Sequence, residues 1–154
     1  MLTRYLMDAS SAIRFCKEHP SDIYISVHQR MAALRSEDRM LMHKLVQREL
    51  DQRDDFARNW AKSFSADQTI DIDNDQGAFI RTLSRDFPQY AATFSQWEYK
   101  DSADPFLIAC GKARGLTVIT EEGSKLAGIP FFCSKYSVAC ITLHEFFRQE
   151  SWTF

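Results

Sequence analysis

Carboxylates are the side chains of this sequence whose types and positions best support chemistry. Asp8 follows a short apolar run over residues 4–7, and the pair Glu121 and Glu122 follows a second apolar run over residues 116–120. If both runs are parallel strands of one sheet, their ends open onto the same edge and these acids converge there. The competing interpretation is that any loop at the end of a strand is polar.

Two further acids occupy unusual positions. Asp104 precedes Pro105 at the start of an apolar helical run, which is typical of an N-cap residue followed by proline at the first helical position. The same helix N-terminus would stabilise an ionised carboxylate and hold it ready for a cation. Glu49 lies four residues after Leu45 and three after Val46, with Leu50 beside it, on or next to an apolar helix face. A carboxylate there needs a partner cation, either a basic side chain or a metal.

A set of oxygen donors without histidine or cysteine favours a hard cation, Mg²⁺ or Mn²⁺, over zinc. One or two such ions suit phosphodiester cleavage, since one activates water for attack and a second stabilises the leaving oxygen. The sequence offers no Gly-rich phosphate loop and no histidine in a nucleophile context. The remaining aspartates of the middle region are expected to be ordinary solvated acids: Asp51, Asp54, Asp55, Asp71, Asp73 and Asp75.

The composition indicates one globular domain over residues 1–154. The chain is 45% apolar, and its 19 Lys and Arg against 21 Asp and Glu give a net charge of −2. This balance gives no general attraction to nucleic acid, so contacts to phosphates would have to come from local cations. The candidates, for which a solvated helix face is the competing interpretation, are Arg14, Lys44, Arg48, Lys112, Arg114 and Lys125.

The cysteines and the apolar segments indicate a compartment. The 4 cysteines form no CxxC pair and lie at no metal-finger spacing from histidine, so we expect buried free thiols. Free thiols suit a reducing cytoplasm. Charged residues interrupt the apolar N-terminus, and no stretch is long enough for a membrane helix. These features predict a soluble cytoplasmic protein without a membrane partner.

Short apolar runs alternate with helical patterns along the chain. Strands are predicted over residues 4–7, 40–42, 116–120 and 138–142, with Tyr5, Leu6, Val118 and Ile119 buried in neighbouring strands. Helices are predicted from Ser10 or Ser11 to about 17, over 21–36, twice within 44–64, before Pro88, over 90–98, over 105–114 up to Gly115, and over 143–149. This order predicts an α/β fold with a central parallel sheet of four or five strands and helices on both faces.

Four segments carry a resemblance to a known family. YLMDASSAI, LVQREL, SADPFLIACGKARGLTVITEE and VACITLHEFFRQ resemble the toxin-like (VapC-like) branch of the PIN-domain ribonucleases over about residues 4–150. The resemblance implies a PIN-like three-layer fold. It assigns catalysis and metal binding to Asp8, Glu49, Asp104 and Glu122, with Ser10 as a supporting residue. Many members carry Asp or Asn where this chain has Glu122, and this departure leaves open whether Glu122 ligates the metal directly. Whether Glu121 or Glu122 serves the site is a separate open point.

The resemblance also implies an activity. It predicts an endoribonuclease that depends on Mg²⁺ or Mn²⁺, cleaves single-stranded RNA and serves as the toxin of a toxin–antitoxin pair, with an antitoxin as inhibitor and a homodimer as the common state. The alternative is a non-catalytic PIN-like module that binds RNA or protein. A phosphatase with Asp8 as its nucleophile is disfavoured, because Ser10 stands where such an enzyme needs a second aspartate.

Overall fold

The computed structural model describes residues 2–53, 55–90 and 102–154. Within this part of the chain, 5 strands form one parallel sheet in the order β3-β2-β1-β4-β5. The strands are β1 (Tyr5–Met7), β2 (Met40–His43), β3 (Thr69–Ile70), β4 (Thr117–Ile119) and β5 (Cys140–Ile141). The predicted α/β class with a central parallel sheet is confirmed.

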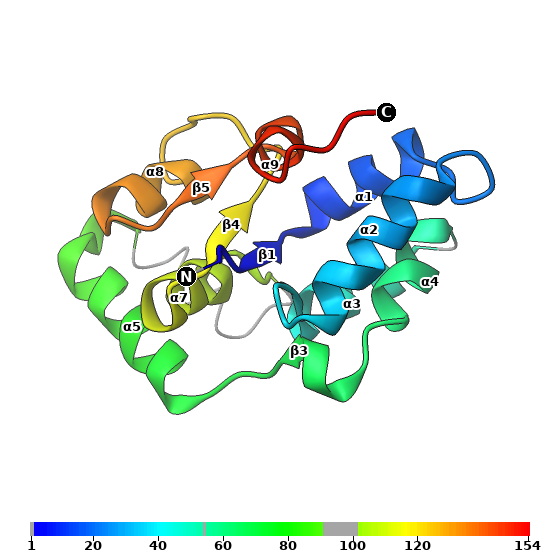
Figure 1. The fold of residues 1–154 in the computed structure, drawn as a ribbon. Helices are drawn as coiled ribbons and strands as arrows, with labels where there is room; N and C mark the ends of the chain where they lie inside the picture. The colour runs from blue at the N-terminus through cyan, green and yellow to red at the C-terminus, as the bar shows by residue number, and fades with distance from the viewer. Residues whose placement is uncertain (1, 54, 91–101) are drawn as a thin grey trace.

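Helices cover the sheet in two groups, as Figure 1 shows. One group is α1 (Ala9–Glu18), α2 (Ile25–Ser36), α3 (Lys44–Asp51) and α4 (Phe56–Lys62). The other is α5 (Asn74–Asp86), α7 (Asp104–Arg114) and α8 (Ile129–Lys135), and the terminal helix is α9 (Leu143–Gln149). Short 3₁₀ turns lie at η1 (Ala66–Gln68) and η2 (Pro88–Tyr90). Right-handed crossovers, which are the rule in parallel sheets, place helices on opposite faces when the chain moves along the sheet in opposite directions, as it does from β1 to β3 and then from β3 to β5.

The central strands are apolar throughout because both faces of the sheet are covered. Leu6 of β1 pairs with Val118 of β4, and Met7 pairs with Ile119. All four side chains are 0% exposed, and so is Tyr5. The predicted burial of the two neighbouring strands is confirmed.

The chain order reverses at β1, since β2 and β3 continue on one side of it and β4 and β5 on the other. In open α/β sheets, ligands bind at the carboxyl ends of the strands where this reversal occurs. The carboxyl ends of β1 and β4 therefore mark the expected position of a site. Asp8 directly follows β1, and Thr120 directly follows β4.

Several predicted features differ in detail. Asp8, and neither Ser10 nor Ser11, is the N-cap residue of α1. The helix predicted over residues 21–36 begins only at Ile25, and Ile23, expected on its inner side, is 70% exposed. The residues before Ile25 form a turn after Pro20, with backbone N–H groups bonded to the Pro20 carbonyl.

The helix α8 was not predicted, because its residues IPFFCSK carry no clear helical spacing. The helix predicted over residues 90–98 lies outside the described residues, apart from the end of η2. All cysteines carry free thiols as predicted, with Cys16, Cys110 and Cys133 buried and Cys140 half-buried. No helix in the described part of the chain is long and apolar enough to cross a membrane.

Gly111 allows α7 to lie directly on the sheet. A Cβ atom at this position would lie 2.5 Å from Cγ1 of Val138 and 3.3 Å from Cγ2 of Val118. We expect Gly111→Ala to lower the free energy of unfolding by about 1–3 kcal/mol, because the added methyl overpacks this contact. Urea denaturation followed by circular dichroism measures the change.

Gly77 of α5 provides the matched control. A Cβ atom there would meet its nearest neighbour, Nη1 of Arg81, at 3.7 Å, which is ordinary contact. Gly77→Ala should therefore stabilise the protein by about 0.5–1 kcal/mol through helix propensity alone. Equal effects of the two substitutions would contradict the close packing of α7 on the sheet.

Candidate active site

Asp8 is the centre of the candidate site and is 3% exposed. Its carboxylate caps α1 by accepting a hydrogen bond from the backbone N–H of Ser11 at 2.8 Å. The hydroxyl of Ser10 donates to the same carboxylate, 2.8 Å from Oδ1 and 2.9 Å from Oδ2. Burial raises the pKa of Asp8, while hydrogen bonds from Thr120, Ser11 and Ser10 act in the opposite direction. Asp8 is thus a buried acid whose orientation is fixed from several sides.

Thr120 is a site residue that the sequence interpretation placed only at the end of a strand. Its hydroxyl donates to Oδ2 of Asp8 at 2.5 Å and accepts a hydrogen bond from the backbone N–H of Glu122 at 3.0 Å. Strand register is the reason for the contact, because Met7 pairs with Ile119 and the next residues lie side by side. One sequence signal was available. Thr120 carries a hydroxyl group and ends the predicted strand over residues 116–120, which neighbours the strand that Asp8 follows.

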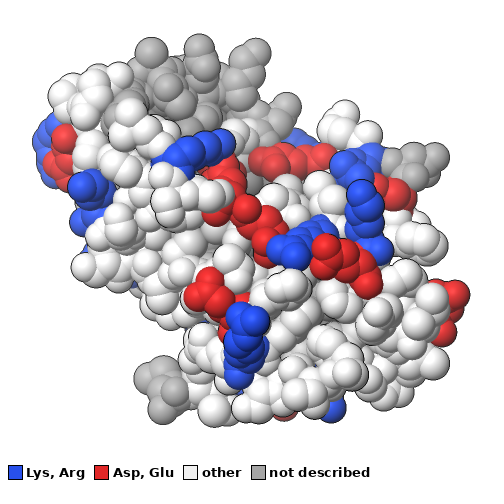
Figure 2. Space-filling model, turned by 90° about the horizontal axis from the view of Figure 1, so that it is seen from above, with Lys and Arg blue, Asp and Glu red and all other residues white. Residues whose placement is uncertain are grey.

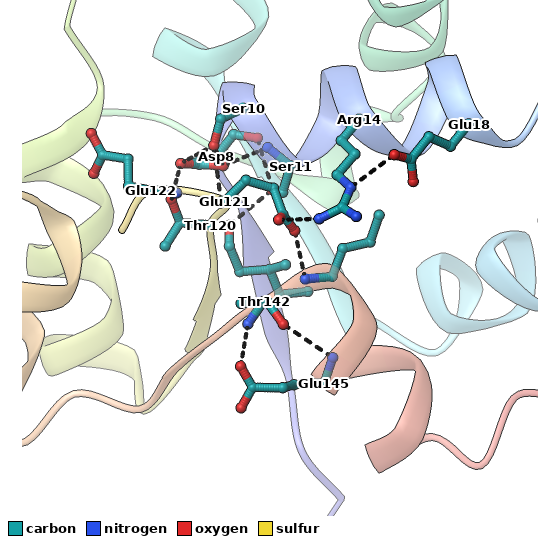
Figure 3. A network of polar contacts seen from close by, with 12 residues as sticks. Asp8, Ser10, Ser11, Arg14, Glu18, Thr120, Glu121, Glu122, Thr142 and Glu145 are labelled. Carbon is teal, nitrogen blue, oxygen red and sulfur yellow. Dashed lines mark hydrogen bonds and ion pairs between the residues drawn. The ribbon is translucent and has the colours of Figure 1, made fainter. Parts of the chain in front are cut away.

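Glu121 and Glu122 have different surroundings, shown in Figure 3. Glu121 Oε2 forms an ion pair with Arg14 Nη1 at 2.5 Å, and Glu121 Oε1 accepts a hydrogen bond from the backbone N–H of Leu143 at 2.8 Å. The backbone N–H of Glu121 donates to the Ser10 hydroxyl. Glu121 therefore ties the β4 loop to α1 and to the start of α9.

Glu122 is held by the loop that follows it. One carboxylate oxygen accepts a hydrogen bond from the backbone N–H of Ile129 at 3.0 Å, and the other lies 3.3 Å from Nζ of Lys125. Direct ligation of a metal by Glu122 would have to replace one of these contacts. Its geometry thus suits an outer position in the site better than a direct ligand.

Glu49 reaches the start of α7. Its Oε1 accepts a hydrogen bond from the backbone N–H of Ala103 at 2.6 Å. A backbone amide is thus one partner of Glu49, in addition to the cation that its position on an apolar helix face predicts. Because the amide comes from a residue 54 positions later, no local pattern could have indicated it.

Asp104 is the acid on which the charges of the other three acids act. The N-cap residue of α7 is Ala103, and Asp104 occupies the first helical position, so the interpretation of Asp104 as the cap is wrong. Burial raises the pKa of Asp104 to about 7, with further contributions from the charges of Glu122, Glu49 and Asp8 and an opposing one from Lys125. The structure therefore brings all four predicted acids into electrostatic contact.

The residues present fit a hard divalent cation in their chemistry. All the converging donors are carboxylate oxygens, and their repulsion is the condition that a cation relieves. Among the described residues, no group of three or more His, Cys, Asp and Glu side chains is already gathered closely enough to hold an ion. Binding an ion would thus draw the carboxylates together.

The predicted phosphate-binding cations are mostly engaged with other groups. Arg14 pairs with Glu121 and Glu18, Arg114 with Asp73, and Lys44 with Asp71. Lys112 donates to the carbonyl of Tyr136, and Lys125 pairs with Glu122. On the face shown in Figure 2, described acidic and basic side chains lie next to one another along a winding band.

The aspartates expected to be solvated are largely as predicted. Asp51 is paired with Lys62 at 2.7 Å and Arg58 at 3.2 Å at the surface. Asp55 and Asp73 cap α4 and α5. Asp54 lies outside the described residues.

A family model described as a domain of unknown function, DUF4411, matches residues 5–154. The chain belongs to the DUF4411 family. No curated protein matches it. The matched range of the DUF4411 domain runs from β1 to the end of α9 and beyond, so all four candidate acids belong to the family domain itself.

The raised pKa of Asp104 predicts how pH affects the stability of this DUF4411 domain. The Asp104 carboxyl ionises near pH 4 in the unfolded chain and near pH 7 in the folded one. The folded state therefore holds the proton more tightly. This tighter binding of the proton by Asp104 stabilises the folded protein fully below about pH 4, and the stabilisation is lost as pH rises through about 7.

We therefore expect Asp104→Asn to stabilise the protein at pH 8 in EDTA by up to about 4 kcal/mol and to flatten the loss of stability between about pH 4 and 7. Thermal unfolding measured at a series of pH values tests this. Asp22→Asn, which changes an exposed acid in the turn before α2, should leave the profile unchanged. An unaltered pH profile in Asp104→Asn would contradict the raised pKa that burial and the neighbouring acids give Asp104.

Proposed function

We propose that this protein is an endoribonuclease that depends on Mg²⁺ or Mn²⁺ and hydrolyses phosphodiester bonds of single-stranded RNA. The observation that carries the proposal is the placement of four acids at one end of the sheet: Asp8 follows β1, Glu122 lies just beyond β4, and Glu49 binds the backbone N–H of Ala103, the residue before Asp104. These acids come from separate parts of the chain and meet at the strand ends where α/β folds bind ligands. The resemblance to PIN-domain ribonucleases supports the same assignment.

Asp8, Glu49 and Asp104 would hold one or two ions, with Glu122 in an outer position. The bound ion would supply Lewis-acid chemistry, activating water and stabilising negative charge on the phosphate. The protein's own groups prepare this arrangement. Ser10 and Thr120 hold the orientation of Asp8 by donating hydrogen bonds to its carboxylate. Glu121 fixes the loop between β4 and α8 through Arg14 and the start of α9.

Asp104 gives the site a dependence on pH. A carboxyl with a pKa of about 7 is largely protonated in mildly acidic solution. It must lose that proton before it can ligate a cation, so the affinity for Mg²⁺ or Mn²⁺ should rise with pH up to about 7.

The biological setting forms a further part of the proposal. The resemblance favours the toxin of a toxin–antitoxin pair, inhibited by an antitoxin and assembled as a homodimer. Free, mostly buried cysteine thiols favour a cytoplasmic location.

The second candidate function is a non-catalytic module that binds RNA or protein. One observation favours it: Arg14 and Lys125, two cations beside the acids, are paired with Glu121 and Glu122. Cations engaged in this way contribute less to binding phosphates at the site. Cleavage assays separate the two functions.

We expect Asp8→Asn to lower the rate of Mn²⁺-dependent cleavage of single-stranded RNA by about 100-fold or more, because it removes the charge of a ligand with little change in size. A gel assay of a labelled oligoribonucleotide measures the rate. Asp51→Asn, which changes an exposed acid on the same helix as Glu49, should cleave like the wild type. Wild-type protein that cleaves no RNA with either metal would contradict the nuclease and favour the binding module.

Glu122→Gln should have a weaker effect than Asp8→Asn, since both Glu122 oxygens are held within its own loop. An outer carboxylate of this kind is worth about 10–100-fold in activity or metal affinity. The same gel assay measures it. If Glu122→Gln inactivates the protein as fully as Asp8→Asn, Glu122 is a direct ligand.

A further inference from the structure

A hollow lies at the far end of α1 from the candidate active site. It encloses about 450 Å³ between the end of α1, the outer side of α9 and the residues that follow α9. It is lined by His19, His144, Phe147, Arg148, Trp152, Thr153 and Phe154. The lining is largely aromatic and basic, and it contains no acidic side chain.

Aromatic rings form the walls of this hollow. The ring of Phe147 stacks on Trp152, with the planes 25° apart and the centroids 5.8 Å apart. Phe154 meets Phe147 edge to face at 5.2 Å, and Phe154 remains 60% exposed. Exposed faces of such rings are platforms on which nucleobases of any sequence can stack.

Arg148 supplies the charge beside these rings. It is exposed on α9, one helical turn after His144 on the same face. Its guanidinium makes no ion pair or hydrogen bond with any other described residue. In contrast, the cations next to the acids, Arg14 and Lys125, are neutralised by carboxylates. Arg148 is therefore available to a phosphate group where those two are not.

The hollow is connected to the active site through α1 and α9. Asp8 caps the start of α1 and His19 follows its end, so the two sites are about 16 Å apart along the helix. Glu121 binds the backbone N–H of Leu143, the residue before His144. Figure 3 shows Arg14 and Glu18 following one another along α1 away from Asp8, with α9 beginning below Glu121.

We propose that this hollow binds a nucleotide of single-stranded RNA, at a distance from the bond that is cut. A base stacks against Phe154 and the neighbouring Trp152, and Arg148 contacts a backbone phosphate. This inference rests on the proposed function and adds to it a site that selects flexible, unpaired RNA, since a base held within a duplex cannot be stacked on a side chain.

The test measures binding separately from cleavage. Fluorescence anisotropy follows a short fluorescein-labelled single-stranded oligoadenylate in EDTA, where no divalent cation is available. We expect Arg148→Ala to weaken binding about tenfold. The dependence of the binding constant on salt concentration should also decrease, by about the amount that one phosphate contact contributes. Arg81→Ala, which removes an exposed arginine from α5 in the other helix layer, should bind within about twofold of the wild type.

The contribution of stacking needs its own variant. Phe154→Leu keeps an apolar side chain but removes the ring, and we expect a loss of about fivefold or more in affinity. An abasic oligonucleotide of the same length should bind Phe154→Leu and the wild type equally. The inference is overturned if Arg148→Ala and Phe154→Leu bind oligoadenylate as the wild type does, which is the outcome expected of a surface for a protein partner.

The nucleotide site and the nuclease can fail separately. Arg148→Ala should weaken oligoadenylate binding by the same factor in Asp8→Asn as in the wild type, because Asp8 does not line the hollow. If Asp8→Asn stops cleavage while Arg148→Ala and Phe154→Leu bind normally, only the nucleotide site is refuted. If the wild type binds through Arg148 and never cleaves RNA, the nucleotide site is supported and the nuclease is refuted.

Discussion

The burial of the Asp8 carboxylate is the constraint on which the structure around the strand ends depends. A carboxylate that is 3% exposed requires hydrogen-bond donors. They come from Ser10 and Ser11 at the start of α1 and from Thr120 at the end of β4. Satisfying one buried acid therefore caps a helix, joins two neighbouring strands and orients the loop that carries Glu121. Local stability and the geometry of the candidate site are properties of the same contacts.

A second constraint arises because further acids are placed near the first. The hydrogen bond from Ala103 to Glu49 brings α3 to the start of α7, where Asp104 lies. The resulting like-charge repulsion contributes to the raised pKa of Asp104, and it is unfavourable for folding when these groups are ionised. Proteins retain such unfavourable groupings where a ligand relieves them, and a divalent cation would do so here. The proposed chemistry explains an arrangement that folding alone disfavours.

Much of the fold could be predicted because the relevant signals are local. Uninterrupted apolar runs identified β1 and β4, and Gly115, with φ of 65°, ends α7 as expected. The acids were identified by their positions at strand ends and on an apolar helix face. Contacts between distant residues could not be predicted, because sequence spacing carries no information about them. Arg14 and Glu121, for example, are 107 residues apart and form an ion pair.

Calorimetric titration with Mn²⁺ tests most directly whether the four acids form one metal site. Titrations near pH 6.5 in two buffers of different ionisation enthalpy report the heat of binding and the number of protons released. The account predicts saturable binding with proton release, because Asp104, with a pKa of about 7, must ionise to accept the cation. Asp104→Asn should bind more weakly and release fewer protons. An absence of binding, or binding that Asp104→Asn leaves unchanged, would contradict the account.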